Sequence, residues 1–189
     1  MRIALLTFAM FTSFAASAST QSSVPASPEQ AKPTTAAPTA AQSDVSSVDA
    51  IMKALYDSIS GPAGKPRDWD RLRSLFLPDA RMMPVSQNPD SGEVRIRMLS
   101  VDDYVRTSAS FIEKRGFHET EKARYAESFG HIAYVMSSYE ARTEVEPIQM
   151  VGTNTLQLMN DGKRWWIVSL MWESQPTNKV LPKYYPAKD

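Results

Sequence analysis

From Phe117 to Glu173 the apolar residues recur at every second position, with no helical pattern between them. We place four consecutive strands at residues 117–129, 132–143, 148–159 and 163–173. Tight turns are expected at Gly130-His131 and at Asn160-Asp161-Gly162, where Asp-Gly is a strong hairpin signal. Strands that follow one another without crossover helices form an antiparallel sheet, and such a sheet needs cover on one face. We therefore expect a strongly curved sheet with helices on its concave side.

Three helices are predicted upstream of these strands. The first begins at a cap formed by Ser46 and Asp49 and ends at Gly61-Pro62, the second begins near Asp68 and stops before Pro78, and the third runs from a Ser100 cap to Gly116. Two strands are expected between the second and third helices. The strand at 80–85 contains a proline and is placed at a sheet edge, whereas the strand at 94–98 alternates and is expected to be half-buried.

The N-terminus has the pattern of a secretory signal. A basic residue is followed by an apolar run over residues 3–14 and by Ala16-Ser17-Ala18, so cleavage is expected after Ala18 and the protein is expected in the periplasm or outside the cell. Residues 19–44 consist mainly of Ser, Thr, Ala, Gln and Pro and are predicted to be a disordered linker. The folded domain is assigned to residues 45–179 and a C-terminal tail to residues 180–189.

Composition excludes several classes of function. The chain has 21 basic and 21 acidic residues and shows no basic stripe, which argues against nucleic-acid binding. It contains no cysteine, so stability in an oxidising compartment must come from the core. The two histidines, His118 and His131, fall at opposite ends of one predicted hairpin, so no metal site is expected. No dinucleotide or phosphate-binding fingerprint is present, and no cofactor is predicted.

Several short motifs occur in a particular order along the chain. They are Ser60-Gly61-Pro62, Asp68-Trp69, the run 75–81 (LFLPDAR), the run 130–133 (GHIA) and the run 161–168 (DGKRWWIV). In this order and spacing the sequence resembles the nuclear transport factor 2-like (NTF2-like) superfamily, in its bacterial SnoaL-like branch. The resemblance covers almost all of residues 48–173. It implies a cystatin-like α+β barrel, that is, a cone-shaped antiparallel sheet with three helices on its concave side and one pocket, often in a dimer. Members of the superfamily include isomerases, dehydratases, polyketide cyclases and many non-catalytic binders, so the fold does not define the function.

Strand registers predict which residues face that pocket. A two-residue loop at Asp161-Gly162 would place Asn154 opposite Ser169. The turn at Gly130-His131 would place Ala123 opposite Ser138, Glu121 opposite Glu140, and Glu119 opposite Arg142. The polar ends of the two hairpins coincide, so we expect this polar cluster at one end of the concave face.

This cluster suggests proton chemistry. Two carboxylates that face each other repel, which raises the pKa of one of them, so Glu121 and Glu140 are the predicted catalytic acid and base. Asn154 is predicted to hold a substrate carbonyl or oxyanion. Arg142 would neutralise an acidic substrate or pair with Glu119. The ligand-binding prediction is completed by Trp69, Ser138 and Ser169. A register error of one residue would turn all of these strand residues outward.

A second group of residues is placed on the outer face of the sheet. Trp166, Leu170 and Trp172 form an apolar stripe, which favours a homodimer through this face. The alternative is burial beneath the C-terminal tail, where Tyr184 and Tyr185 would supply the packing.

Two functions remain open at this point. The first is a cofactor-independent isomerase, dehydratase or cyclase that acts on a small, partly apolar substrate through a carboxylate base. The second is a non-catalytic ligand-binding or assembly module in the periplasm, tethered by residues 19–44.

Overall fold

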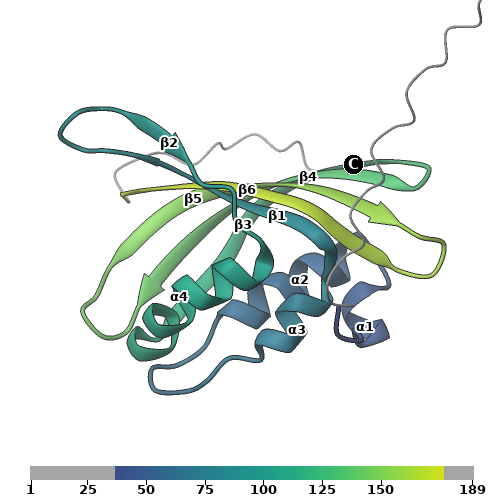
Figure 1. Cartoon of the computed structure of the whole chain (residues 1–189), viewed down its shortest axis with the longest axis horizontal. Coiled ribbons are helices and arrows are strands. Elements are labelled where there is room, and N and C mark those ends of the chain that lie inside the picture. Colours follow the sequence, from purple (N-terminus) through teal and green to yellow (C-terminus); the bar gives the residue numbers. More distant parts are fainter. Residues whose placement is uncertain (1–36, 177–189) are drawn as a thin grey trace, which may run out of the picture. The chain divides into compact units, whose positions relative to one another are not determined.

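The computed structural model describes residues 37–176, in which helices pack against one face of a six-stranded sheet (Figure 1). The elements in chain order are α1 (Gln42–Val45), α2 (Val48–Ile59), α3 (Trp69–Ser74), β1 (Phe76–Gln87), β2 (Val94–Ile96), α4 (Val101–Arg115), β3 (Phe117–Phe129), β4 (Ile132–Thr143), β5 (Gln149–Asn160) and β6 (Trp165–Pro176). The expected signal peptide and the expected tail fall outside the described residues. Within those residues no helix combines the length and apolarity needed to cross a bilayer.

The strand order in the sheet is β2-β1-β6-β5-β4-β3. Strands β3 to β6 form the predicted antiparallel meander, and β3 and β4 have the predicted bounds. The expectation of a wholly antiparallel sheet is wrong at one place, because β1 pairs in parallel with β6. This pairing puts β1 between β2 and β6, so Pro84 does not lie on an edge strand as predicted.

Helix starts follow the predicted capping chemistry with one difference. Ser100 and Asp103 form a full capping box at the start of α4, and Asp68 caps α3 by accepting from the backbone of Arg71. The cap of α2 is Ser47, one residue after the predicted Ser46. Helix α3 is shorter than expected, since the chain has already entered β1 at Phe76.

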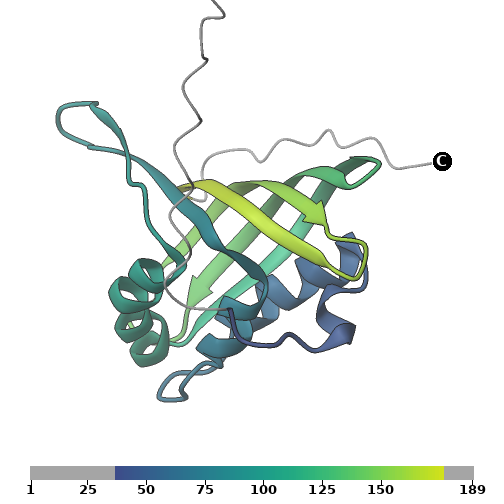
Figure 2. The same ribbon diagram turned by 45° about the vertical axis from the view of Figure 1, so that its right-hand side comes forward.

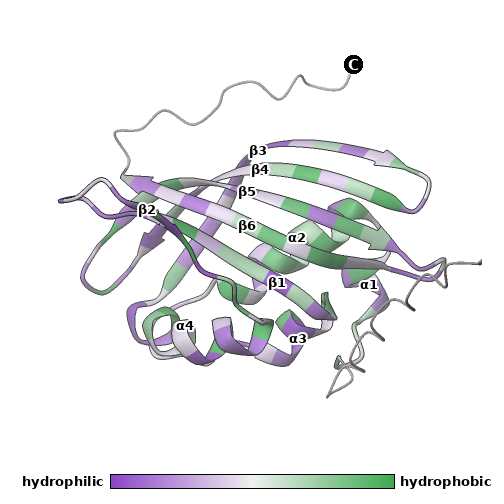
Figure 3. Ribbon diagram, turned by 45° about the horizontal axis from the view of Figure 1, so that its top comes forward, coloured by the Kyte–Doolittle hydropathy of each residue, from purple (hydrophilic) through white to green (hydrophobic). Residues whose placement is uncertain are grey.

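The core lies between the concave face of the sheet and the helices, with α2 running across that face (Figure 2). Ile51 and Met52 of α2 and Val135 of β4 are fully buried there. Apolar segments of the strands and of α2 face each other, while the hairpin around β2 is largely hydrophilic (Figure 3). Burying a side chain of this size contributes about 1.5–3 kcal/mol, so this layer is the main stabilising element of the fold.

The folded domain begins before the predicted boundary at residue 45. Helix α1 starts at Gln42 and buries Val45 in the core. Asp44 accepts two hydrogen bonds from Arg71 of α3, at 2.7 and 3.0 Å. These hydrogen bonds lower the pKa of the Asp44 carboxyl. The last residues of the predicted linker are therefore part of the domain.

Arg67 fastens the connection between α2 and α3. Its guanidinium donates to the carbonyls of Ile59 (3.3 Å), Pro62 (3.2 Å), Lys65 (2.7 Å) and Gly61. The side chain is almost fully buried, at 9% exposed. The planar guanidinium group of arginine can donate to several carbonyl groups at once. The ammonium group of a lysine on its flexible side chain cannot do this.

The hairpin of β1 and β2 extends beyond the helices (Figure 1). Val94, Ile96 and Met98 alternate as predicted, but they are 63%, 51% and 61% exposed. The expectation of a half-buried strand is therefore wrong. At this end the sheet has no helix beneath it to receive the apolar side chains.

Candidate functional site

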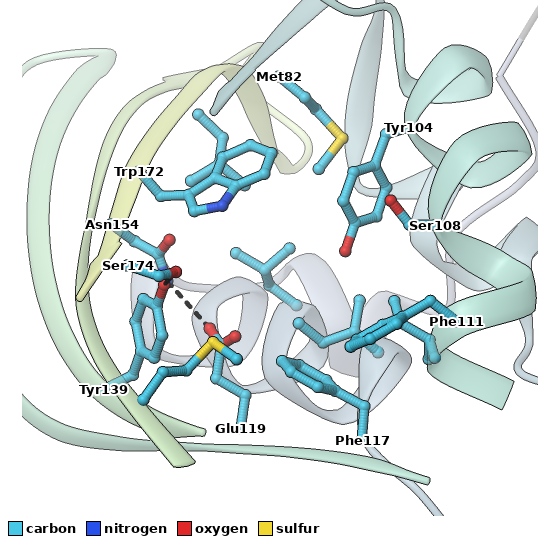
Figure 4. A pocket seen from close by; sticks show the side chains of 15 residues that line it. Met82, Tyr104, Ser108, Phe111, Phe117, Glu119, Tyr139, Asn154, Trp172 and Ser174 are labelled. Atoms are coloured by element: carbon cyan, nitrogen blue, oxygen red, sulfur yellow. Dashed lines mark hydrogen bonds between the residues drawn. The ribbon is translucent and has the colours of Figure 1, made fainter. Parts of the chain in front are cut away.

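A cavity of about 210 Å³ lies between the concave face of the sheet and helices α2 and α4 (Figure 4). Its walls are mainly apolar and aromatic. The lining residues are Leu55, Ile59, Met82, Tyr104, Ser108, Phe111, Ile112, Phe117, Glu119, Tyr139, Met150, Asn154, Leu170, Trp172 and Ser174. No lysine, arginine or histidine is among these lining residues of the described chain. The cavity is smaller than the 300–1,000 Å³ of pockets for drug-sized ligands, so it suits a small molecule.

Glu119 of β3 supplies the single carboxyl group in this lining. Burial raises the pKa of Glu119 to about 8, although a hydrogen bond from Asn154 works in the opposite direction. That bond joins Asn154 Nδ2 to Glu119 Oε1 at 3.2 Å (Figure 4). A carboxyl in this state can exchange a proton near neutral pH, which is what a general acid or base needs.

Two aromatic side chains stand opposite the carboxyl group. Tyr104 of α4 and Trp172 of β6 contact each other edge to face, with ring centroids 5.8 Å apart at 88°. The Tyr104 hydroxyl points into the cavity (Figure 4) and makes no hydrogen bond to a described residue. Burial and the charge of Glu119 raise the pKa of Tyr104, so its hydroxyl keeps its proton and can donate to a bound molecule.

Tyr139 of β4 forms a further wall and depends on a glycine. Its hydroxyl bonds to Ser174 Oγ at 2.7 Å, and its ring crosses over Gly152, the residue opposite it on β5. A Cβ at Gly152 would overlap the Tyr139 ring and approach the Glu173 carbonyl to 2.6 Å. Gly152 is therefore required for the close approach of Tyr139, and not for an unusual backbone angle.

Asn154 lies in the cavity wall, as predicted, but not in the predicted role. Its Nδ2 donates to both Glu119 Oε1 and Tyr56 Oη, each at 3.2 Å. An amide nitrogen has two N–H groups, and both are used here. Asn154 therefore has no donor left for a substrate carbonyl or an oxyanion, and that part of the prediction is wrong.

The register of β3 and β4 explains where the predicted carboxylates lie. Ala123 opposes Ser138 as predicted, but this pair lies on the outer face, because the buried residues of β4 are the odd-numbered ones such as Val135 and Tyr139. A β-bulge then inserts one unpaired residue, Lys122, between Glu121 and Ala123. The bulge reverses the alternation, so Glu121, Glu119 and Phe117 face inward.

Glu121 and Glu140 consequently do not face each other, and the predicted catalytic pair is wrong. Glu121 opposes Tyr139 and binds Arg124, whereas Glu140 opposes Thr120 on the outer face. Glu140 is exposed and pairs with Lys122 at 3.1 Å. Glu119 opposes Ala141, not Arg142.

The β5–β6 hairpin departs from its predicted register as well. Asn160 opposes Trp165, so the loop has four residues instead of two. A second irregularity at Val168 moves the register by one more residue, and Asn154 opposes Trp172 instead of Ser169. Ser169 opposes Gln157 on the outer face and does not line the cavity. The two-residue loop was the wrong choice because the Asp161 side chain caps a longer turn, by accepting from the backbone of Lys163 and Arg164.

The predicted outer stripe is therefore divided between the two faces. Leu170 is buried in the core and Trp172 lines the cavity, so neither can take part in an outer-face interface. Trp166 remains outside, where the guanidinium of Arg164 stacks on its ring at 3.6 Å and Asp161 accepts its indole N–H. Tyr184 and Tyr185, the alternative cover, lie outside the described residues.

The remaining predicted ligand-binding residues do not reach the cavity. Trp69 packs against the core and donates to Glu113 Oε1 at 2.8 Å. Ser138 is buried on the outer face beside Thr153. Arg142 lines a separate polar groove on the outer side of β3, β4 and β5. Within residues 37–176 no three histidine or acidic side chains converge as a metal site requires.

Sequence reasoning missed the role of Glu119 and the contributions of Tyr104 and Trp172. Glu119 belonged to the predicted polar cluster but was assigned there to a pair with Arg142. Tyr104 carried a usable signal, since it lies on the apolar side of the third predicted helix. The sequence has no signal that places Trp172 in the cavity, because the sheet face on which Trp172 lies depends on the irregularity in β6.

Comparison with known proteins supports the fold. No protein-family model matches the chain, and no curated protein matches it. A solved candidate dehydratase of the NTF2-like family from Streptomyces avermitilis is 15% identical, with a TM-score of 0.52 over 70% of this chain and 96% of that one. A Nostoc punctiforme protein of unknown function with a cystatin-like fold is 9% identical, with a TM-score of 0.51 over 69% and 90%.

A candidate calcium/calmodulin-dependent protein kinase II association domain from Xanthomonas campestris is also similar. It is 14% identical, with a TM-score of 0.50 over 69% of this chain and 86% of that one. The chain thus has the NTF2-like fold, a cystatin-like α+β architecture. These similarities concern the fold, and they do not distinguish the SnoaL-like branch.

Proposed function

We propose that this protein is a cofactor-independent enzyme that moves a proton on a small, mostly apolar carbonyl or hydroxy compound. The observation that carries the proposal is the Glu119 carboxyl, which sits in a mainly apolar cavity with no cationic side chain among the described residues that line it. Buried carboxyl groups normally have a charged partner, and a carboxyl group whose only partner is neutral is a candidate for proton transfer. The absence of a cation in the lining also disfavours an anionic substrate.

The chemistry uses two groups. The Glu119 carboxylate takes a proton from the carbon next to a substrate carbonyl, and the Tyr104 hydroxyl donates a hydrogen bond to the oxygen on which negative charge develops. If the substrate has a double bond beside that carbon, protonated Glu119 then returns the proton to the far carbon of the double bond, which shifts the double bond next to the carbonyl group and completes an isomerisation. Alternatively it protonates a leaving β-hydroxyl group, which departs as water and completes a dehydration. The candidate dehydratase from Streptomyces avermitilis has the same fold, which is compatible with the second outcome.

The test uses the exchange of substrate protons with solvent. A panel of small neutral ketones and β-hydroxy ketones is incubated with the protein in D₂O, and loss of the α-proton signal is followed by NMR. We expect exchange that rises with pH through about 8, the pKa of Glu119. Glu119→Gln should lower it by at least about 100-fold, the usual contribution of an acid–base group. Glu140→Gln is the matched control, because it makes the same change on the outer face.

Tyr104→Phe should lower the rate with little effect on binding, because its hydroxyl acts on charge that forms during the reaction. Binding of the panel without any exchange would favour the second candidate, a non-catalytic ligand-binding or assembly module. The similarity to the Xanthomonas campestris association domain is the observation that supports a role in assembly.

We also propose that the protein is exported and forms homodimers. Residues 1–18 have the composition of a cleavable signal, and intact-mass measurement of periplasmic material should show a chain that begins at Ser19. A chain that still carries Met1 would contradict export.

For the dimer, the exposed apolar residues of β6 are Val168 and Met171, at 37% and 39% exposed, and they replace the predicted outer stripe. Sedimentation of Val168→Glu/Met171→Glu should show a monomer, and an unchanged mass would argue against this face.

A further inference from the structure

A chain of hydrogen bonds leads from the cavity through the core to the surface. Behind Asn154, Tyr56 of α2 bonds to Ser137 of β4 at 2.7 Å, and Ser137 donates to Glu121 of β3. Glu121 is held by Arg124 through two bonds of 2.8 and 2.5 Å. The middle of this chain is dry, since Tyr56 is 7% and Ser137 0% exposed.

The outer end of the chain determines the direction of its bonds. Glu121 forms a bidentate ion pair with Arg124, so its carboxylate can only accept. The single hydrogen of Ser137 is therefore committed to Glu121. Tyr56 must then donate to Ser137, since Ser137 has no second hydrogen to give. Burial raises the pKa of Tyr56, so its hydroxyl keeps the proton that this bond requires.

The same reasoning fixes the amide of Asn154. With its hydrogen committed to Ser137, the Tyr56 oxygen can only accept from Asn154. The amide must therefore present Nδ2, and not Oδ1, to Tyr56. Because the same nitrogen contacts Glu119 Oε1, that oxygen must also act as an acceptor in either charge state of Glu119.

We propose that Arg124, Glu121, Ser137 and Tyr56 are positioning residues that confine the exchangeable proton of Glu119 to Oε2. Glu119 Oε2 has no hydrogen-bond partner among the described residues, and no side-chain oxygen there is both buried and unpartnered. Oε2 is therefore open to the cavity and to a bound molecule. The proposal rests on the proposed function for its catalytic meaning, but the geometry can be tested without any reaction.

Apart from the ion pair of Glu121 and Arg124 on the same strand, few charged or titratable groups of residues 37–176 face Glu119. They are Tyr56 from α2, Tyr104 from α4 and Tyr139 from β4, each with a pKa raised by burial, and from β5 and β6 the cavity receives only neutral side chains. Burial has the larger effect on the pKa of Glu119, and the Asn154 amide provides the hydrogen bond that opposes it, so the direction of this amide can shift the charge of Glu119. Donation from Nδ2 favours the carboxylate, whereas an inverted amide would present Oδ1 and favour the protonated acid.

Ser137→Ala is the direct test, because Ser137 belongs to the chain but does not line the cavity. The change releases the hydrogen of Tyr56, which can then donate to Asn154 Oδ1 once the amide inverts. Carboxyl ¹³C NMR titration of the unliganded protein, with Glu119→Gln to assign the signal, should show the pKa of Glu119 rise by about one pH unit or more. Ser138→Ala is the matched control, since it removes the same atom from the next residue on the opposite face, and it should leave the pKa of Glu119 unchanged.

A double variant separates positioning from a general loss of packing. In Ser137→Ala/Tyr56→Phe no donor remains to hold Oδ1, so Nδ2 should turn back to Glu119 and the pKa should return toward the wild-type value. If each substitution only damaged the packing, the pKa of Glu119 in the double variant would instead lie further from the wild-type value than in Ser137→Ala. The proposal would be overturned by a larger shift in the pKa of Glu119 in the double variant than in Ser137→Ala, or by an unchanged pKa in Ser137→Ala.

Arg124→Gln and Lys122→Gln provide a second pair if the core variants fail to fold. Both remove one positive charge from β3, but Lys122 belongs to the bulge and pairs with Glu140 outside. In 0.3 M salt only Arg124→Gln should raise the pKa of Glu119, and equal effects would contradict the chain. These titrations report on the hydrogen-bond chain even if no substrate exchanges, so failure of the proposed function and failure of the chain are distinguishable.

Discussion

Replacing Glu119 by glutamine should stabilise the protein, and more strongly as the pH rises. The pKa of Glu119 is about 8 in the folded chain, against 4.5 for an ordinary glutamate. Below pH 4.5 both the folded and the unfolded forms carry the proton, and the charge has no effect. Between 4.5 and 8 the unfolded chain loses its proton first, so the wild type loses stability with rising pH. Above 8 the loss is complete.

The magnitude follows from the size of the pKa change. One pKa unit corresponds to about 1.36 kcal/mol, so a rise of roughly 3.5 sets an upper limit of roughly 5 kcal/mol. Glu119 is only partly shielded from solvent, so its charge is screened and we expect about half of this value. Glutamine retains the shape and the oxygen that accepts from Asn154, so it should not disturb the packing.

The assay is urea unfolding of wild type and Glu119→Gln at pH 5 and pH 9. The difference in free energy of unfolding between the two proteins should grow by about 2–3 kcal/mol in favour of the variant between these pH values. Other titrating groups cancel because they are common to both chains. Glu140→Gln should show no such growth, since Glu140 is exposed. A Glu119→Gln difference that stays constant with pH would refute the reasoning.

Three further perturbations test other parts of the structure. Arg67→Lys should lower the free energy of unfolding by about 2–4 kcal/mol in urea titration, because an ammonium cannot satisfy the carbonyls that the guanidinium reaches. An effect below about 0.5 kcal/mol would show that water replaces it. Gly152→Ala should destabilise the fold by about 1–3 kcal/mol and displace Tyr139. The displacement should change the near-ultraviolet circular dichroism signal of the packed tyrosine ring. An unchanged spectrum and stability would contradict the close contact. Glu140→Gln should change stability by less than about 0.5 kcal/mol, since it removes only an exposed ion pair, and calorimetry would detect a larger effect.

The fold could be predicted from the sequence where periodicity and local chemistry agree. The bounds of β3 and β4 follow from alternation between clear turn residues, and the start of α4 follows from the capping box of Ser100 and Asp103. The parallel pairing of β1 with β6 could not be predicted in this way. It joins segments far apart in sequence, and no local pattern records it.

The site was accessible only in part. Asn154 was placed correctly in the pocket, because it lies on the regular inner face of β5. Glu140 was misplaced because the even-numbered face of β4 was taken as the inner face, whereas the buried residues are odd-numbered ones such as Val135 and Tyr139. The bulge in β3 is a separate irregularity, which moves Glu121 away from Glu140 by reversing the alternation of that strand. A bulge depends on the twist of the whole sheet, so the residues beside Lys122 give little sign of it.

The bulge at Lys122 has a consequence for how this strand tolerates change. The Lys122 side chain is partly exposed and makes only a surface ion pair, so most substitutions there should be harmless. Deletion of the same residue would be severe, because it would restore regular alternation and turn either Glu119 or Arg124 to the opposite face. At this position, then, the presence of a residue matters and the identity of its side chain does not. A survey of in-frame deletions along β3 would find its sharpest loss of folded protein where substitutions have the least effect.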